Sequence, residues 1–416
     1  MVVIPSNVRG RDIRRNRSGR GVRGAGAVLA AVAILGACSD GPAGSVADGW
    51  TGSIDTLSAG GLRIVSPATP AWGDRPWRLV EDVRIGAGVG PALGQVPDLA
   101  VTPDGGAFIL DGDAREIIRV DRDGAEVRRI GGPGSEPGLF EYPRRIRLRG
   151  GVLWVEDLGA GRWSAFDTAG SFQGAFATPA RVAGGNADMT PDGLVGIGRF
   201  RDGDDVTEFS GRWRAEGDGF RLVDSLSAPP VPPVFALETA MARDGRPMSI
   251  AYPIPLAHQP TVQPDPEGEG WIVTPGGGEY RIIWLDFAGV TRREVERSFE
   301  AVPVPVEERE QQVERLPPDL RATSSDRVPS VYPPFDRIVP GEDGGVWAVR
   351  RVADGEGRTR LAFDAFDSVG RFIGEVESET SLDGLWLHHV GPTGVWGVRR
   401  DVSGRLVVVR FRIEGR

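Results

Sequence analysis

The sequence has one cysteine and three histidines among its 416 residues. A single cysteine cannot form a disulfide within the chain, so this is not a disulfide-stabilised scaffold. A zinc lyase needs several histidines around its metal, and this set cannot be assembled from His258, His388 and His389. Successive side chains of a regular strand point to opposite faces, so we expect that His388 and His389 do not bind one metal together.

Asparagine is also scarce, since Asn186 is the only one after Cys38. A lactonase-like site would combine carboxylates with an Asn around a divalent cation. A Gly-x-Ser-x-Gly nucleophile motif does not occur in a strand-to-helix context. We therefore predict no catalytic residue, no bound metal and no cofactor.

The apolar run near the start of the sequence is too short to form a transmembrane helix. An arginine-rich segment precedes the apolar run from Ala25 to Ala37, as in a signal peptide, and this run is shorter than the roughly 20 residues that span a bilayer. The run ends in Leu35-Gly36-Ala37-Cys38, the pattern of a bacterial lipobox. We predict that residues 1–37 are a lipoprotein signal peptide and that lipid on Cys38 holds the chain at a membrane. The alternative is an ordinary signal peptide with an incidental cysteine.

Acidic residues outnumber basic ones after the signal segment. Residues 1–37 contain seven arginines and Asp12, a net charge of +6, so the rest of the chain carries −15 against −9 for the whole sequence. Nucleic-acid binding needs a basic face, so we predict no nucleic-acid partner. Ser39 stands where an aspartate would favour inner-membrane retention, so we expect the outer membrane of a Gram-negative cell envelope.

Short apolar runs between turn residues are abundant. The stretch from Pro97 to Gly132 contains four such runs, closed by Pro-Asp-Gly, Asp-Gly and Gly-Gly turns. This pattern predicts an antiparallel meander of four strands. One such sheet cannot cover both of its faces, so it needs similar sheets beside it.

The chain supplies these similar sheets. A glycine followed by a short apolar run recurs six times, mostly about 45 residues apart, at Gly106, Gly151, Gly193, Gly270, Gly345 and Gly394. Six repeats at this period predict an all-β, six-bladed β-propeller. The last repeat shows three clear runs, so we predict that the N-terminal strand Trp77–Ile85 closes the last blade.

The first repeats resemble the NHL repeat. The resemblance rests on Phe108–Asp111, Ile117–Asp121, Gly131–Gly134 and Pro137–Phe140. It covers the first two blades, and the remaining four are similar in architecture alone. NHL-type propellers bind proteins or RNA, and their relatives include lactonases and lyases, so the resemblance implies the fold more closely than the function.

The predicted domain organisation has three parts: the signal peptide 1–37, a flexible tether 38–60 and a propeller 61–416. Long insertions are expected at about 233–268 and 300–334, and the second contains a predicted helix over Val306–Leu316. We favour a functional rim or lid for these loops over solvated slack.

We expect the strand after each repeated glycine to lie near the propeller axis. Acidic and basic residues would then gather at one channel mouth, where they could bind an anionic or zwitterionic ligand. The alternative is that they pair across blades or point into water. These candidates are Asp111, Glu156, Asp157, Arg199, Arg350, Arg351, Arg399 and Arg400.

The sequence favours a monomeric, non-catalytic binding module at the cell envelope, with a protein, peptide or glycan as its partner. The alternative is a metal-assisted hydrolase or lyase that uses Asp111, Glu156 and Asp157 as ligands or base. A third possibility is a structural role in which the propeller spaces its partners.

Overall fold

The computed structural model describes residues 49–415, apart from gaps at 73–75, 181, 203–204, 230–233, 244–245, 325, 354–358 and 379. The predicted signal peptide, Cys38 and the first part of the predicted tether lie outside the described residues. Two compact units divide the chain: the larger comprises 46–237 and 253–416, and the smaller includes 238–252.

Residues 98–131 fold as the predicted meander. Its four antiparallel strands are β4 (Asp98–Val101), β5 (Ala107–Asp111), β6 (Glu116–Val120) and β7 (Glu126–Gly131). The turn between β6 and β7 is held by the Asp121 carboxylate, which accepts hydrogen bonds from the backbone N–H groups of Asp123 and Ala125. Gly124 ends this turn at φ 83°, where a Cβ would lie 2.7 Å from Val83, so glycine is required there.

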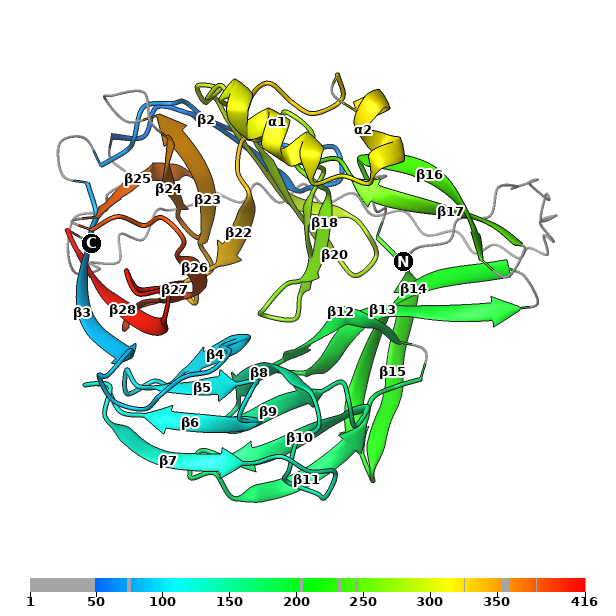
Figure 1. Ribbon diagram of the computed structural model, residues 1–416, viewed down its shortest axis with the longest axis vertical. Helices are drawn as coiled ribbons and strands as arrows, with labels where there is room; N and C mark the ends of the chain where they lie inside the picture. Colours follow the sequence, from blue (N-terminus) through cyan, green and yellow to red (C-terminus); the bar gives the residue numbers. More distant parts are fainter. Residues whose placement is uncertain are drawn as a thin grey trace, which may run out of the picture. The chain divides into compact units, whose positions relative to one another are not determined.

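The same antiparallel order recurs along the larger unit. Two groups form separate sheets, with strands β8 (Pro143–Arg149), β9 (Val152–Asp157), β10 (Arg162–Asp167), β11 (Phe172–Ala177), and β12 (Val182–Thr190), β13 (Gly193–Asp202), β14 (Asp205–Glu216), β15 (Gly219–Ser227). The later strands are β18 (Thr261–Pro264), β19 (Gly270–Thr274), β20 (Arg281–Asp286), β21 (Thr291–Arg297), β22 (Arg337–Pro340), β23 (Val346–Ala353), β24 (Thr359–Phe366), β25 (Phe372–Ser378), β26 (Trp386–Gly391), β27 (Gly394–Arg400) and β28 (Leu406–Glu414). The larger unit is therefore all-β and propeller-like, with sheets that radiate from a centre (Figure 1).

The last group takes its fourth strand from the N-terminal part of the chain. β3 (Arg78–Gly86) pairs antiparallel with β28, with Ile85 opposite Val408, and it also runs parallel to β25 over two residues. The predicted pairing of residues 77–85 with the final strands is confirmed by this register. β3, near the start of the larger unit, and β28, at its end, thus pair in one sheet, and each covers an edge of the other.

The segment before β3 also pairs. β1 (Ser53–Thr56) pairs with β2 (Leu62–Ser66), and β2 runs parallel to β21 with Ile64 opposite Val295. Ile64 is fully buried in the adjoining core. β1 lies within the predicted flexible tether, and the strand forms there because its backbone groups pair with β2.

The first strand of each four-stranded group lies at the centre. β4 contacts β8, β8 contacts β12, β12 contacts β18, and β26 contacts both β22 and β4 (Figure 1). The prediction that the next strands, such as β5 and β9, lie nearest the axis was wrong, because the strand before each of them lies there. The repeated glycines mark the second strand of each group, and a strand period alone does not tell which edge of a sheet faces inward.

Neighbouring sheets pack through apolar side chains. One buried cluster brings Ile109 and Ile118 of the first meander together with Val83 of β3, Trp396 of β27 and Val408 of β28. Each sheet therefore covers a face of the next, as the repeat pattern requires.

The two predicted insertions contain regular structure. In the 300–334 insertion, α1 (Val306–Glu314) and α2 (Pro318–Ser324) are short helices, and α1 confirms the predicted helix. In the 233–268 insertion, β16 (Ala236–Arg243) and β17 (Arg246–Pro253) form a two-stranded sheet, most of which belongs to the smaller unit. Among the described residues, no helix has the length and apolar character needed to cross a membrane.

Candidate functional site

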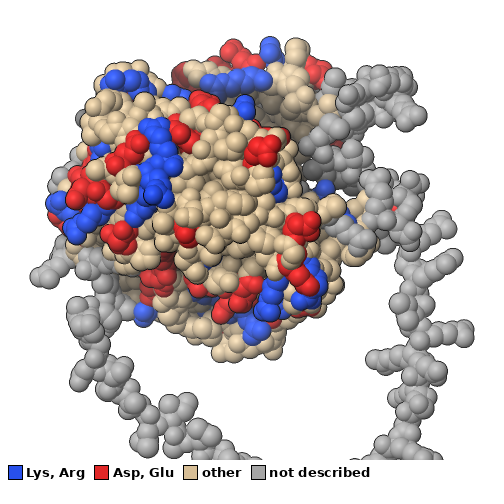
Figure 2. All heavy atoms as spheres, turned by 90° about the horizontal axis from the view of Figure 1, so that it is seen from below, with Lys and Arg blue, Asp and Glu red and all other residues tan. Residues whose placement is uncertain are grey.

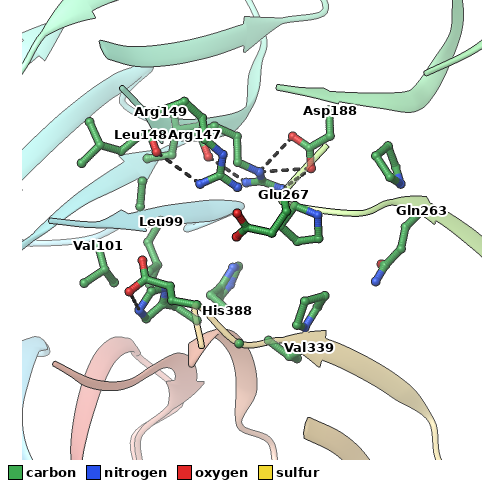
Figure 3. Close-up of a pocket in the computed structure, with 18 residues that line it drawn as sticks. Leu99, Val101, Arg147, Leu148, Arg149, Asp188, Gln263, Glu267, Val339 and His388 are labelled. Carbon is green, nitrogen blue, oxygen red and sulfur yellow. Dashed lines mark hydrogen bonds and ion pairs between the residues drawn. The ribbon is translucent and has the colours of Figure 1, made fainter. Parts of the chain in front are cut away.

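The central strands enclose a cavity of about 210 Å³, which we call the channel. Its lining comes from β4, β8, β12, β18, β22 and β26, and from the turns that follow β18 and β22. Figure 3 shows Arg147, Arg149 and Asp188 on one side of this space and His388 on the other, with Glu267 between them. The channel therefore collects side chains that are far apart in the sequence.

Arg147 links three central strands. From β8, its Nη1 donates to Asp98 Oδ2 of β4 at 2.6 Å, and its Nη2 donates to Asp188 Oδ2 of β12 at 2.9 Å. Burial opposes the charge of Asp98, but the Arg147 guanidinium and the ring of His388, 3.3 Å away, outweigh it and hold the pKa of Asp98 at about 2. The Arg147 guanidinium therefore pairs with two carboxylates and links the three strands β4, β8 and β12.

Arg149, two residues further along β8, is different. Its Nη1 donates to the backbone carbonyl of Leu148 at 3.2 Å, but its buried Nε has no hydrogen-bond partner among the described residues. No carboxylate of the described residues lies within ion-pair distance of it. Burial and the neighbouring Arg147 lower the pKa of Arg149, because they disfavour its charged form. Arg149 is a cation in the channel without a paired anion.

Both β26 histidines line the channel, because the strand is not regular at this point. The pairing of β26 with β27 shifts register between Leu387 and His389. A β-bulge adds a residue and breaks the strict alternation of faces, so adjacent side chains can reach the same space. Burial and Arg149 lower the pKa of His389 to about 4, so its imidazole is neutral at pH 7, and its buried Nε2 has no hydrogen-bond partner in the described part of the chain.

Two glutamates stand at the same end of the channel as Arg149. Glu267 lies in the turn after β18 and Glu342 in the turn after β22. Glu342 Oε2 is 3.9 Å from His389 Nε2, and burial raises the pKa of Glu342. A Cβ on Gly391 would lie 2.5 Å from this histidine nitrogen and 2.7 Å from this glutamate oxygen, so the absence of a side chain at residue 391 makes room for both.

The channel also contains an unused amide. Gln263 Nε2, from β18, is buried and has no hydrogen-bond partner among the described residues. Buried polar groups in folded proteins nearly always have partners, because an unsatisfied one costs about 1–3 kcal/mol. Arg149, Gln263 and His389 line a single cavity, and each has one such atom among the described residues.

Two of the sequence-predicted carboxylates hold turns. Asp111 accepts hydrogen bonds from the backbone N–H groups of Gly94, Asp113 and Ala114, at 2.8 to 3.1 Å. Asp157 does the same for Glu141, Tyr142, Gly159 and Ala160. Both carboxylates are buried, and their oxygens are used by the backbone.

Glu156 and Arg199 lie apart from those turns. Glu156 is buried, its Oε2 is 3.9 Å from Arg145 Nη1, and burial raises its pKa. Arg199 forms an exposed ion pair with Glu208 on the neighbouring strand, at 2.8 Å. The two residues are not in the lining of the channel.

The remaining predicted arginines pair with acids or with the backbone. Arg350 Nε lies 2.8 Å from Asp364 in a buried ion pair that is not aligned as a hydrogen bond, and its Nη2 donates to Glu375 at 2.9 Å. The partners of the other three are Asp336 for Arg351 (3.5 Å), Glu81 for Arg399 (2.5 Å) and the Gly404 carbonyl for Arg400 (2.7 Å). The strand partners Asp364, Glu375 and Glu81 belong to the same sheets as their arginines, so these contacts lie within sheets and not across blades.

The predicted residues lie at the opposite end of the sheets from Arg149. In the register of β8 and β9, Arg149 is opposite Val152 at the start of β9, whereas Asp157 at the end of β9 is opposite Pro143. The structure therefore does not bring the eight candidates together around the channel. Arg149, His389, Gln263, Glu267 and Glu342 were missed. The signal that could have found them is the four arginines in the short strand Pro143–Arg149, an unusual number for a strand between apolar neighbours.

The described residues do not assemble a metal site. They contain no group of three or more His, Cys, Asp or Glu side chains placed to hold a metal ion. In the channel, Glu267, Glu342 and His389 share the space with the positive charge of Arg149. What the channel can do chemically is donate hydrogen bonds and offer charges of both signs.

The surface carries mixed charge. Figure 2 shows one face of the molecule on which basic and acidic side chains lie close to one another, without a broad basic area. Ion pairs between strands include Arg63–Glu296 (2.7 Å) and Arg410–Asp82 (2.9 Å). A nucleic-acid interface would need a stripe of unpaired basic residues.

Comparison with known proteins gives structural likeness alone. No family model matches the chain, and no curated protein matches it. Among solved structures, a protein from Bacteroides fragilis that is named as an exported protein has a TM-score of 0.46 and 12% identity, covering 85% of this chain and 99% of that one. A streptogramin B lyase has a TM-score of 0.36 and 12% identity, covering 81% and 98%, and the virginiamycin B lyase from Staphylococcus aureus has 0.40 and 13%, covering 80% and 99%. All three lie at low identity.

Proposed function

We propose that this protein is a lipid-anchored, monomeric, six-bladed β-propeller of the bacterial cell envelope that binds a ligand in its central channel. In this proposal the blades are the four-stranded groups that start at β4, β8, β12, β18, β22 and β26, with β3 completing the last one. The lipobox ending at Cys38 supports the anchor, and the NHL-like residues in the first two blades support the fold.

The observation that carries the binding function is Arg149. A partly buried guanidinium without a carboxylate in ion-pair distance among the described residues is costly, and a carboxylate or phosphate group would relieve that cost through charge-assisted hydrogen bonds. Gln263 and His389 line the same cavity. The binding module therefore acts on an envelope peptide, protein terminus or glycan that carries an anionic group.

Native mass spectrometry of the detergent-purified protein tests this function. We expect a small molecule to remain bound to the wild-type protein and to be lost from Arg149→Gln. Arg122→Gln serves as the matched control, because Arg122 has a side chain that is 76% exposed in a turn remote from the channel lining. Equal retention by all three proteins would remove the channel from the proposal.

A second candidate is a hydrolase or lyase, favoured by the neutral His389 beside Glu342. A neutral imidazole with a free Nε2 can accept a proton, and a carboxyl group with a raised pKa can return one. A screen of lactones and esters tests it. Turnover that is abolished in both His389→Gln and Glu342→Gln would support catalysis, and turnover that survives both would exclude this pair.

A further inference from the structure

The Arg149 end of the channel offers both signs of charge without pairing them. Glu267 and Glu342 line the cavity together with Arg149, and neither glutamate lies within ion-pair distance of an arginine of the described residues. The three charges influence one another, since both glutamates favour the charged form of Arg149. In contrast, Arg147 in the next layer is fully paired with Asp98 and Asp188.

We propose that the channel ligand is a compact zwitterion with an α-carboxylate and an α-ammonium group. This inference rests on the proposed function and names the ligand class for the same site. The carboxylate pairs with the guanidinium of Arg149, beside the Gln263 side chain that lines the same cavity. The ammonium group donates to the carboxylates of Glu267 and Glu342.

Single charges suit this site poorly. An anion that approaches Arg149 also faces Glu267 and Glu342, and a cation that approaches the two glutamates also faces Arg149. Opposite charges within about 4–6 Å stabilise each other and like charges do the reverse, so a ligand with one charge gains at one contact and loses at the other. A zwitterion gains at both.

The size of the channel limits the ligand. Pockets for drug-sized molecules measure about 300–1,000 Å³, so the cavity of about 210 Å³ accepts a small molecule or one end of a larger one. An adjoining cleft of about 940 Å³ shares Pro266, Glu267, Pro340 and Gly341 with the channel. A side chain of the ligand, or the rest of a longer molecule, can lie in that cleft while the amino and carboxylate groups remain at Arg149.

The close fit around Gly391 adds to this assignment. His389 and Glu342 occupy the space that a Cβ at residue 391 would fill. Their approach leaves the Glu342 carboxylate near the imidazole but 3.9 Å from it, beyond hydrogen-bond distance. The carboxylate therefore lies beside the imidazole without a hydrogen bond to it and can accept one from a ligand.

Isothermal titration of the full-length protein in detergent tests the ligand class. The probes are L-alanine and Nε-acetyl-lysine, with acetate and methylammonium as single-charge controls. We expect the zwitterions to bind at least 10-fold more tightly than either control. Arg149→Gln and Glu267→Gln should each weaken zwitterion binding by about 10–100-fold, as expected for the loss of a charged hydrogen bond. Arg122→Gln should bind as the wild type does.

Comparing the two zwitterions separates the possible sources of the ligand. Binding of both zwitterions supports the amino-carboxylate end of a longer molecule, and binding of L-alanine alone supports a free small amino acid. If acetate binds as tightly as L-alanine and Glu267→Gln has no effect, the zwitterion assignment is overturned while channel binding stands.

If no probe binds but the native ligand is still lost from Arg149→Gln, the ligand class is wrong and the proposed function survives. If the two channel variants Arg149→Gln and Glu342→Gln both retain every ligand of the wild type, both proposals are overturned. Melting temperatures of the variants confirm that each remains folded.

Discussion

Arg147 lies 2.6 Å from Asp98, and this ion pair joins two neighbouring central strands that are 49 residues apart in the sequence. Arg147 also reaches Asp188 on the next central strand, at 2.9 Å. Polar residues at the centre of the sheets thus replace the apolar packing that joins the sheets further out. Two residues along the same strand, Arg149 has no such carboxylate partner among the described residues, and our proposed ligand site rests on this contrast between the two arginines.

The Asp98–Arg147 pair should contribute measurably to stability. We expect Asp98→Asn to lower the free energy of unfolding by about 2 kcal/mol, because Arg147 loses one of its two carboxylates in a mostly buried position. Urea unfolding followed by tryptophan fluorescence measures the change. A change equal to that of Asp123→Asn, in an exposed turn, would contradict a stabilising role for the pair.

Stability should fall as pH is lowered from 7 to 5. The pKa of His389 falls from 6.5 in the unfolded chain to about 4 in the folded protein, so the unfolded chain binds more protons in this range and gains stability relative to the fold. The expected loss is about 2 kcal/mol for this histidine, from 1.5 pH units at roughly 1.4 kcal/mol each.

His258 has a similarly lowered pKa of about 4, caused by burial, and adds to the same loss. His389→Gln should therefore flatten the pH dependence by about half. Urea midpoints measured at pH 7, 6 and 5 give the comparison, and an unchanged slope in His389→Gln would show that the buried ring titrates normally.

Closure by β3 should stabilise the whole larger unit. Ile85 of β3 is fully buried in the neighbouring core cluster. Ile85→Ala should therefore lower the free energy of unfolding by about 2–5 kcal/mol. Val127→Ala, on an outer strand where the side chain is 62% exposed, is the matched control and should cost less than about 0.5 kcal/mol. Similar costs for the two variants would mean that the closing strand contributes no more than an outer edge does.

Lipid attachment should depend on Cys38. Metabolic labelling with a radioactive fatty acid is expected to mark the wild-type protein, and Cys38→Ser should remain unlabelled and leave the membrane fraction. Ser39→Ala keeps the cysteine and should label normally. Labelling of Cys38→Ser would contradict the lipobox interpretation.

The repeat pattern was sufficient for the all-β fold and for the pairing of β3 with β28. Both follow from local signals, namely apolar runs, turn residues such as Asp121 and Gly124, and a missing run in the last repeat. The position of the axis could not be found in this way, because a strand period looks the same from either edge of a sheet.

The channel residues escaped prediction for related reasons. The β-bulge before His389 depends on how β26 pairs with β27, and no single residue in that segment announces it. Arg147 and Arg149 have the same residue type and face, yet their partners come from other strands. Which arginine is paired is therefore a property of the assembled sheets.

A crystal structure of the protein grown with L-alanine tests the central claim most directly. The account predicts ligand density in the channel, with the carboxylate at the Arg149 guanidinium and the ammonium group between Glu267 and Glu342. Density at another site with an empty channel, or a carboxylate group at the Asp111 and Asp157 end of the sheets, would contradict it.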